Sequence, residues 1–164
     1  MSESQTYAEE MRWILSAIAA SLEGLSPGQL NARPNIADTN SPAVIAGHVM
    51  GVARAYILNM VCGQSIGRNR PLEFQTRLGS AGEAIDALKA LGDEIATALL
   101  ALDPEQLSIE FRPASELWGT NVPERVSRRA TAVHAIRHSA LHLGELRLTV
   151  AMLNEPASDP PIQG

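Results

Sequence analysis

The sequence predicts an all-α protein built as a four-helix bundle, and three observations support this. Apolar residues make up 45% of the 164 residues and charged residues 19%, which is a globular composition. Aromatic residues are scarce, at 4%, while Ala and Leu are abundant, which favours helix. Apolar residues also recur at intervals of three and four in several stretches separated by Pro, Gly, Asn and Asp. We expect one domain over residues 1–155 and a flexible tail at 156–164.

The first two helices are predicted at about residues 6–25 and 41–63. The first has apolar residues at helical spacing and ends at Gly24. The second starts where Ser41 is suited to cap a helix and Pro42 to occupy its first position. Gly63 can adopt the left-handed conformation that ends a helix. These signals predict both boundaries of the second helix.

The third and fourth helices are predicted at about residues 80–102 and 123–154. The third opens with Ser80-Ala81-Gly82-Glu83, a capping-box pattern. Between them, residues 107–121 alternate in part, so a short strand and an extended crossing are both open, and we expect no true sheet. Four helices joined by connections of roughly 15 to 20 residues suggest a bundle, which builds metal sites from inward-pointing side chains.

The four histidines are the main indication of function. His134, His138 and His142 follow one another at four-residue spacing in the fourth helix, and His48 lies in the second. Residues four apart are separated by roughly 40° and 6 Å on a helix, so their imidazoles can share a metal ion. Hydrogen-bonded core histidines are the alternative. However, clustered imidazoles on an apolar face are hard to satisfy without an ion or water, so we expect a metal site.

The fourth helix is apolar on two sides. With His138 at 0°, Glu145 falls near −20° and the two neighbouring histidines within about 40°. The apolar residues expected on this core-facing side are Leu141, Met152 and Leu153. The opposite side, around Arg129 and Arg147, carries Val133, Ile136, Leu143 and Val150. A second apolar face is unusual for a solvated helix, so we expect a homodimer that packs through it.

The run from His138 to Glu145, His-Ser-Ala-Leu-His-Leu-Gly-Glu, and the Gly47-His48 dipeptide that follows Ser41-Pro42 resemble the DinB/YfiT-like superfamily. The resemblance covers most of the chain in its layout. It implies an up-up-down-down bundle, a divalent metal such as zinc or nickel, and frequent dimerisation. Carried over residue by residue, it implies that His48, His138 and His142 are the metal ligands.

Two further residues have open roles. His134 is a partner that orients a ligand, an alternative ligand or a packed core residue. Glu145 accepts a ligand N–H, acts as a catalytic base, or is solvated at the mouth of the bundle. In the common family pattern, Arg and Gln stand where this chain has Leu143 and Glu145, so no role of those two residues is carried over.

The resemblance implies a metal-dependent enzyme, a thiol-dependent S-transferase or a hydrolase, that acts on a small electrophilic molecule and takes a low-molecular-weight thiol as a possible cofactor. Water and thiols both become stronger nucleophiles on such an ion. The alternatives are a non-catalytic stress-response or regulatory bundle with a structural metal, and a helical dimer without one. Cys62 would stand about 21 Å along the helix from His48, so we expect a core residue there. Two interpretations are open for four further residues: they line the mouth of a site for an anionic substrate, or they are surface arginines and packed aromatics. These residues are Arg54, Arg137, Tyr56 and Trp118.

The charge of the chain limits its partners. The formal net charge is −5, and the 13 basic residues, of which only Lys89 is a lysine, are scattered. We therefore expect no binding to nucleic acid or to an anionic membrane. The acidic first ten residues do not resemble a signal peptide, and a single Cys62 fits a reducing compartment, so we expect a cytoplasmic protein. Residues 43–63 are apolar enough to span a bilayer, but we interpret them as a buried helix.

Overall fold

The computed structural model describes residues 1–154, which are mainly helical. The helices and strands are α1 (Glu3–Leu22), α2 (Pro27–Asn31), α3 (Pro42–Ala53), the π-helix η1 (Arg54–Val61), α4 (Arg70–Glu73), α5 (Ala81–Leu100), the 3-10 helix η2 (Pro104–Ser108), β1 (Glu110–Phe111), α6 (Ser115–Trp118), β2 (Val126–Ser127) and α7 (Arg128–Asn154). The described part therefore has seven α-helices rather than four. The predicted tail at 156–164 lies outside the described residues.

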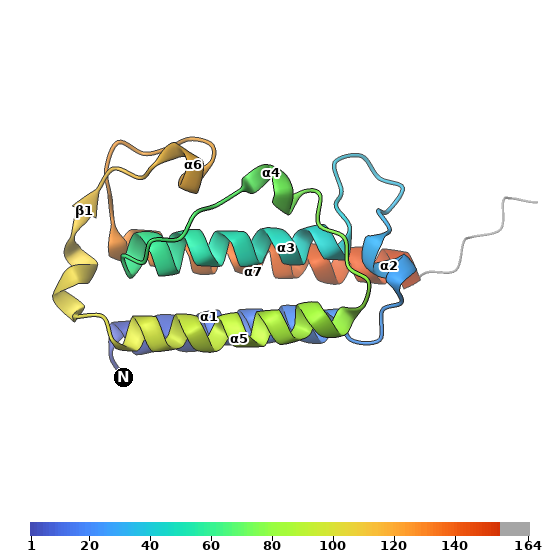
Figure 1. The fold of residues 1–164 in the computed structure, drawn as a ribbon, viewed down its shortest axis with the longest axis horizontal. Helices are drawn as coiled ribbons and strands as arrows, with labels where there is room; N and C mark the ends of the chain where they lie inside the picture. Colours follow the sequence, from blue (N-terminus) through green and yellow to red (C-terminus); the bar gives the residue numbers. More distant parts are fainter. Residues whose placement is uncertain (155–164) are drawn as a thin grey trace, which may run out of the picture.

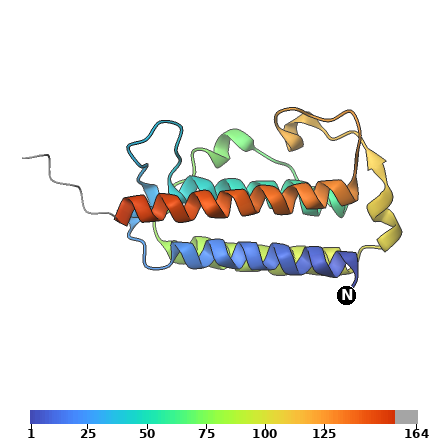
Figure 2. The same cartoon turned by 180° about the vertical axis from the view of Figure 1, so that it is seen from behind.

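The long helices form two layers (Figure 1). One layer is α1 beside α5, and the other is α3, continued by η1, beside α7. The short helices α4 and α6 lie on the outer side of the second layer, as the view from behind also shows (Figure 2). The cover formed by these short helices and their loops therefore lies over α3 and α7, the two helices that carry the histidines.

The directions of the long helices differ from the expected order. Arg129, at the start of α7, pairs with Glu3 at the start of α1, and Gln29 bonds to Asn154 at the opposite end. Hence α1 and α7 run in the same direction, while α3 and α5 run in the opposite one (Figure 1). The up-up-down-down prediction is wrong, because the segment from η1 to α5 crosses the length of the molecule and makes these two helices parallel.

Local capping signals explain most of the helix ends. The Ser41 hydroxyl accepts a bond from the Val44 N–H at 3.3 Å, and Pro42 is the first residue of α3, as predicted. Gly24 has a φ of 77°, which ends the first helix. Ser80 precedes α5 but makes no side-chain capping bond, so the predicted capping box does not form.

The fourth long helix begins at Arg128, later than predicted, because the residues before it form a strand. Phe111 pairs with Val126 and Glu110 with Ser127 in a two-stranded antiparallel sheet. The expectation of no true sheet is wrong for this pair. The strand fixes the entry of the chain into α7, and the Ser127 hydroxyl accepts a bond from the Ala130 N–H at 3.1 Å.

The two faces of α7 differ from those predicted. Leu141 is 69% exposed and Met152 42% exposed, whereas Leu143, predicted to face a partner, is buried. The buried stripe of α7 consists of Thr131, Ala132, Ala135, Ser139, Leu143, Leu146 and Thr149. These mostly small residues allow α7 to lie close to its neighbours, and the histidines occupy the adjoining, half-buried stripe. A helical wheel could not choose between two apolar sides of similar strength.

In the described residues, one helical stretch, Pro42–Val61, is long and apolar enough to cross a bilayer, with a mean hydropathy of 1.4. However, 72% of it is buried inside the fold. A core helix passes the same test, so this stretch is weak evidence for a membrane span. Its helices contact α5 and α7.

Candidate metal centre

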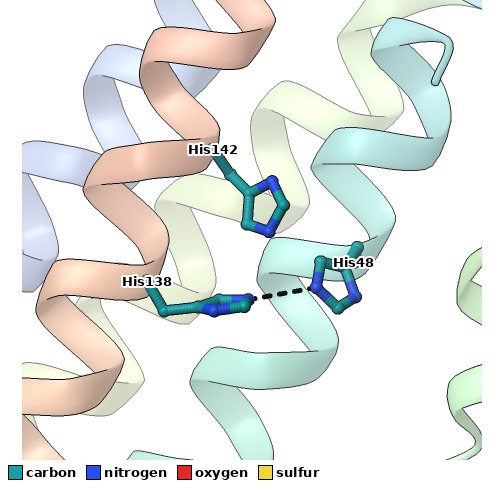
Figure 3. A group of neighbouring side chains, drawn as sticks. All are labelled: His48, His138 and His142. Atoms are coloured by element: carbon teal, nitrogen blue, oxygen red, sulfur yellow. Dashed lines mark hydrogen bonds between the residues drawn. The ribbon is translucent and has the colours of Figure 1, made fainter. Parts of the chain in front are cut away.

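Three of the four histidines converge between α3 and α7. His48 projects from α3, and His138 and His142 project from successive turns of α7 toward it (Figure 3). One ring nitrogen of each lies within 4.8 Å of the others. The same three residues are those that the resemblance implied as metal ligands.

The second nitrogens of two of these rings are held by carboxylates. The Nδ1–H of His48 donates to Glu73 Oε2 at 2.8 Å, and the Nδ1–H of His142 donates to Glu145 Oε2 at 2.6 Å. An ionised carboxylate only accepts hydrogen bonds, so both protons lie on Nδ1. In the neutral form of these rings, the Nε2 atoms of His48 and His142 therefore carry the lone pairs.

These residues fit a divalent metal ion. His48 Nε2 lies 3.1 Å from His138 Nε2, so a proton on His138 can satisfy only one of the facing lone pairs. An ion among the three nitrogens satisfies all of them. A carboxylate on the far nitrogen of the ring is also the usual support of a metal-ligating histidine. Three nitrogen ligands leave a coordination position open, as in catalytic zinc sites.

The third ligand candidate has a low proton affinity. Burial is the main cause that lowers the pKa of His138 to about 3, and positive charge on the neighbouring histidines or on Arg68 lowers it further. At neutral pH this ring is therefore uncharged and offers a lone pair. Burial, together with Arg137, also lowers the pKa of His134.

Glu73 also belongs to the site, although no motif in the sequence predicted it. Its carboxylate accepts two bonds from Arg68, at 2.7 and 2.9 Å, in addition to the bond from His48. Burial raises the pKa of Glu73, but the bonds from His48 and Arg68 outweigh burial and keep it below the ordinary value. Arg68 also donates to the Leu117 carbonyl at 2.7 Å. The candidate ligand His48 is thereby connected to the segment around α6.

Two glycines of α3 allow this arrangement. A Cβ added to Gly51 would lie 2.1 Å from Glu73 Oε1, and one added to Gly47 would lie 2.4 Å from Thr76 Oγ1. Only a residue without a side chain lets the α4 segment approach α3 so closely. The pair of glycines, four residues apart around His48, was the signal in the sequence that could have indicated a second segment packed there.

His134 lies outside the group of three. Its ring contacts Tyr56 and Trp118, with centroids 5.3 and 5.0 Å away, and is 6.0 Å from the ring of His138. Arg137 donates to His134 Nδ1 at 3.1 Å. The structure therefore places His134 in an aromatic wall beside the candidate ligands.

A pocket of about 350 Å³ opens beside the histidines. It is lined by His48, Val52, Tyr56, Arg68, Arg70, Trp118, Thr120, Asn121, Pro123, His134 and His138. Tyr56 and Trp118 thus line the pocket, as expected if they belong to a substrate site. Arg54 does not line this pocket, because it pairs with Glu94 at 3.7 Å. Arg137 lines only a neighbouring one.

Cys62 lies at the far end of η1 and does not reach the site. Burial raises the pKa of its thiol to about 11. Cys62 was predicted to be a core residue, and it is partly buried against the core.

Comparisons with known proteins identify the family and the fold of the chain. The sequence model of the DinB superfamily matches residues 10–146, so the chain belongs to the DinB superfamily. Its structure is similar to that of a conserved protein from Enterococcus faecalis, with a TM-score of 0.72, 16% identity, and coverage of 93% of this chain and 98% of the other. It is also similar to a DinB-like protein from Bacillus subtilis, with a TM-score of 0.61, 16% identity, and coverage of 95% and 94%. No curated protein matches the sequence.

Proposed function

We propose that this chain is a divalent-metal-dependent enzyme, a thiol-dependent S-transferase or a hydrolase that acts on a small electrophilic molecule. The observation that carries the proposal is the convergence of three imidazole nitrogens beside a pocket of about 350 Å³. A structural metal that only joined two helices would not need such a pocket. The opening favours turnover over the non-catalytic alternative.

The residues divide into holding and orienting roles. His48, His138 and His142 would hold zinc or nickel, and Glu73 and Glu145 orient two of them. When bound there, such an ion acts as a Lewis acid that makes a thiol or water nucleophilic near neutral pH. Since Glu145 already accepts the His142 N–H, its position supports orientation of that ligand rather than action as a base.

The arrangement of the long helices supports two further proposals. We infer that α1, α3 with η1, α5 and α7 make up the four-helix bundle of this superfamily, with α2, α4 and α6 in its connections. We also propose a cytoplasmic homodimer that packs through α7. Exposed apolar side chains follow one side of this helix, namely Val133, Leu141, Leu148 and Met152.

Elemental mass spectrometry of untagged protein tests the proposal directly. We expect about one zinc or nickel ion per chain, lost in His138→Ala and retained in His134→Ala, which alters the wall but not the group of three. Metal-loaded protein would then be assayed for transfer of thiols to small electrophiles and for hydrolysis. Absence of metal, with none taken up on titration, contradicts the proposal.

A further inference from the structure

We propose that the pocket beside His48 and His138 binds an organic anion, with its carboxylate on Arg70 and its flat, apolar part against Trp118. The inference rests on the proposed function, because it names the substrate class for the same site. Its test, given below, also works on metal-free protein.

The lining of the pocket is positive without any acid. It contains the guanidinium groups of Arg68 and Arg70 and several neutral residues, but no Asp or Glu. Its histidines are His48, His134 and His138. An ion held by neutral imidazoles would add its full charge to this lining. A pocket of this composition favours anions over neutral or cationic molecules of the same shape.

Arg68 and Arg70 differ in whether their guanidinium groups are free to bind a ligand. Arg68 is 3% exposed and is fully engaged with Glu73 and the Leu117 carbonyl. Glu73, 8% exposed, already accepts hydrogen bonds from Arg68 and His48 and does not line the pocket. The buried carboxylate therefore offsets the charge of Arg68 and leaves that of Arg70 free.

Arg70 is positioned without a carboxylate. Within residues 1–154 it forms no ion pair, whereas Arg12, Arg54, Arg125 and Arg129 each do. Its guanidinium lies 5.0 Å from the centroid of the Phe74 ring, which in turn lies 5.2 Å from the ring of His48. One aromatic ring thus separates the free cation from a candidate metal ligand.

The loop after α6 lies beside the same side chain, which is exposed. Gly119 has a φ of 98°, and a Cβ built there would lie 3.7 Å from Arg70 Nε. Asn121, also at positive φ, and Thr120 add neutral polar groups to the lining. A guanidinium that stacks on Phe74 and forms no ion pair can present its fork of N–H donors to a carboxylate.

The opposite wall is flat and aromatic. The rings of Tyr56 and Trp118 stack at 5.0 Å with an interplanar angle of 16°. The Tyr56 hydroxyl donates to the Trp118 carbonyl at 2.6 Å, so the polar end of Tyr56 is already satisfied. Tyr56 itself is only 4% exposed, so the ring surface left for a ligand is that of Trp118, which suits a planar or apolar segment. The volume matches the lower end of small-molecule sites.

The test compares an acid with its amide. Phenylacetate and phenylacetamide have nearly the same shape and differ in charge, and their binding is measured by calorimetry on the full chain, metal-free and zinc-loaded. We expect phenylacetate to bind metal-free protein about 10-fold more tightly than the amide, and Arg70→Gln to abolish this preference. Arg54→Gln, which changes an exposed arginine outside the pocket, is expected to retain it.

The outcomes of this experiment distinguish the anion site from the proposed metal function. Equal binding of acid and amide to the wild type, no binding of either, or a preference that survives Arg70→Gln would overturn the inference. If zinc binds stoichiometrically while the preference is absent, the proposed metal function stands and the anion site fails. If the preference is present but no metal binds, the anion site stands and the proposed function fails.

Discussion

Glu73→Gln isolates the contribution of the buried carboxylate to the metal centre. The glutamine keeps the size of the side chain and one acceptor oxygen, but it removes the negative charge that His48 and Arg68 share. Loss of such a second contact on a ligating histidine costs roughly 10- to 100-fold in metal affinity. This range corresponds to about 1.4 to 2.7 kcal/mol of binding free energy.

The same substitution also lowers stability, because Arg68 remains buried without its counter-charge. Its side chain is 3% exposed, and a charged hydrogen bond in such a setting contributes on the order of 2 kcal/mol. For a domain of this size, that loss lowers the melting temperature by about 4 to 8 °C. The variant is therefore expected to remain folded at 25 °C, where its metal affinity can be measured.

The assay is a zinc competition titration against a chromophoric chelator, together with the visible spectrum of the cobalt-substituted protein. Glu145→Gln is the matched control, because Glu145 supports His142 from a partly exposed position and has no buried arginine behind it. We expect a similar weakening of zinc binding there, with a smaller change in stability. A folded Glu73→Gln protein whose zinc affinity and cobalt spectrum equal those of the wild type would refute the reasoning.

Two other predictions follow from the packing. Gly51→Ala places a Cβ 2.1 Å from Glu73 Oε1, so this variant should bind zinc at least about 10-fold more weakly although no charge is lost. Gly144→Ala, whose new Cβ would have no atom within 4 Å, should leave the zinc affinity unchanged. Equal zinc affinities of the two variants in the same titration would contradict this prediction. Cys62, with a thiol pKa of about 11, should react slowly with a disulfide reagent at pH 8 and faster as the pH rises, and a rapid stoichiometric reaction at pH 7.5 would contradict its burial.

The candidate metal ligands were predictable from the sequence because their signal is local. His138 and His142 are one turn apart on a helix, so their proximity follows from helix geometry alone. Glu145 lies three residues from His142 on the same helix, which brings their side chains together. His48 was added by the resemblance and by the need for a facing helix. The structure groups it with the other two.

Glu73 was not predictable in the same way because it comes from a different segment. It lies 25 residues from His48 in a helix of four residues, and neither its spacing nor its surroundings indicate a contact with α3. The contact exists because Gly47 and Gly51 leave room for it. A tertiary packing event of this kind leaves only the small residues as a trace in the sequence.

The fold was predictable in its elements and less so in their order. The positions of the long helices follow from apolar spacing and from Ser41, Pro42 and Gly24, which act over a few residues. Their directions depend on which connection crosses the molecule, and chain length alone does not determine this. The faces of α7 were ambiguous, because the same helix carries Leu143 inside and Leu141 outside.

With the proposed ion bound, the histidine group would make metal loading part of the folding equilibrium. Its members come only from α3 and α7, whereas α1 and α5 contribute none. An ion bound there stabilises the native state by mass action, by about 2.7 kcal/mol at 100 times its dissociation constant. Amide hydrogen exchange would therefore slow first in the parts of α3 and α7 that face each other. In a cell, the abundance of the folded protein would follow the supply of metal.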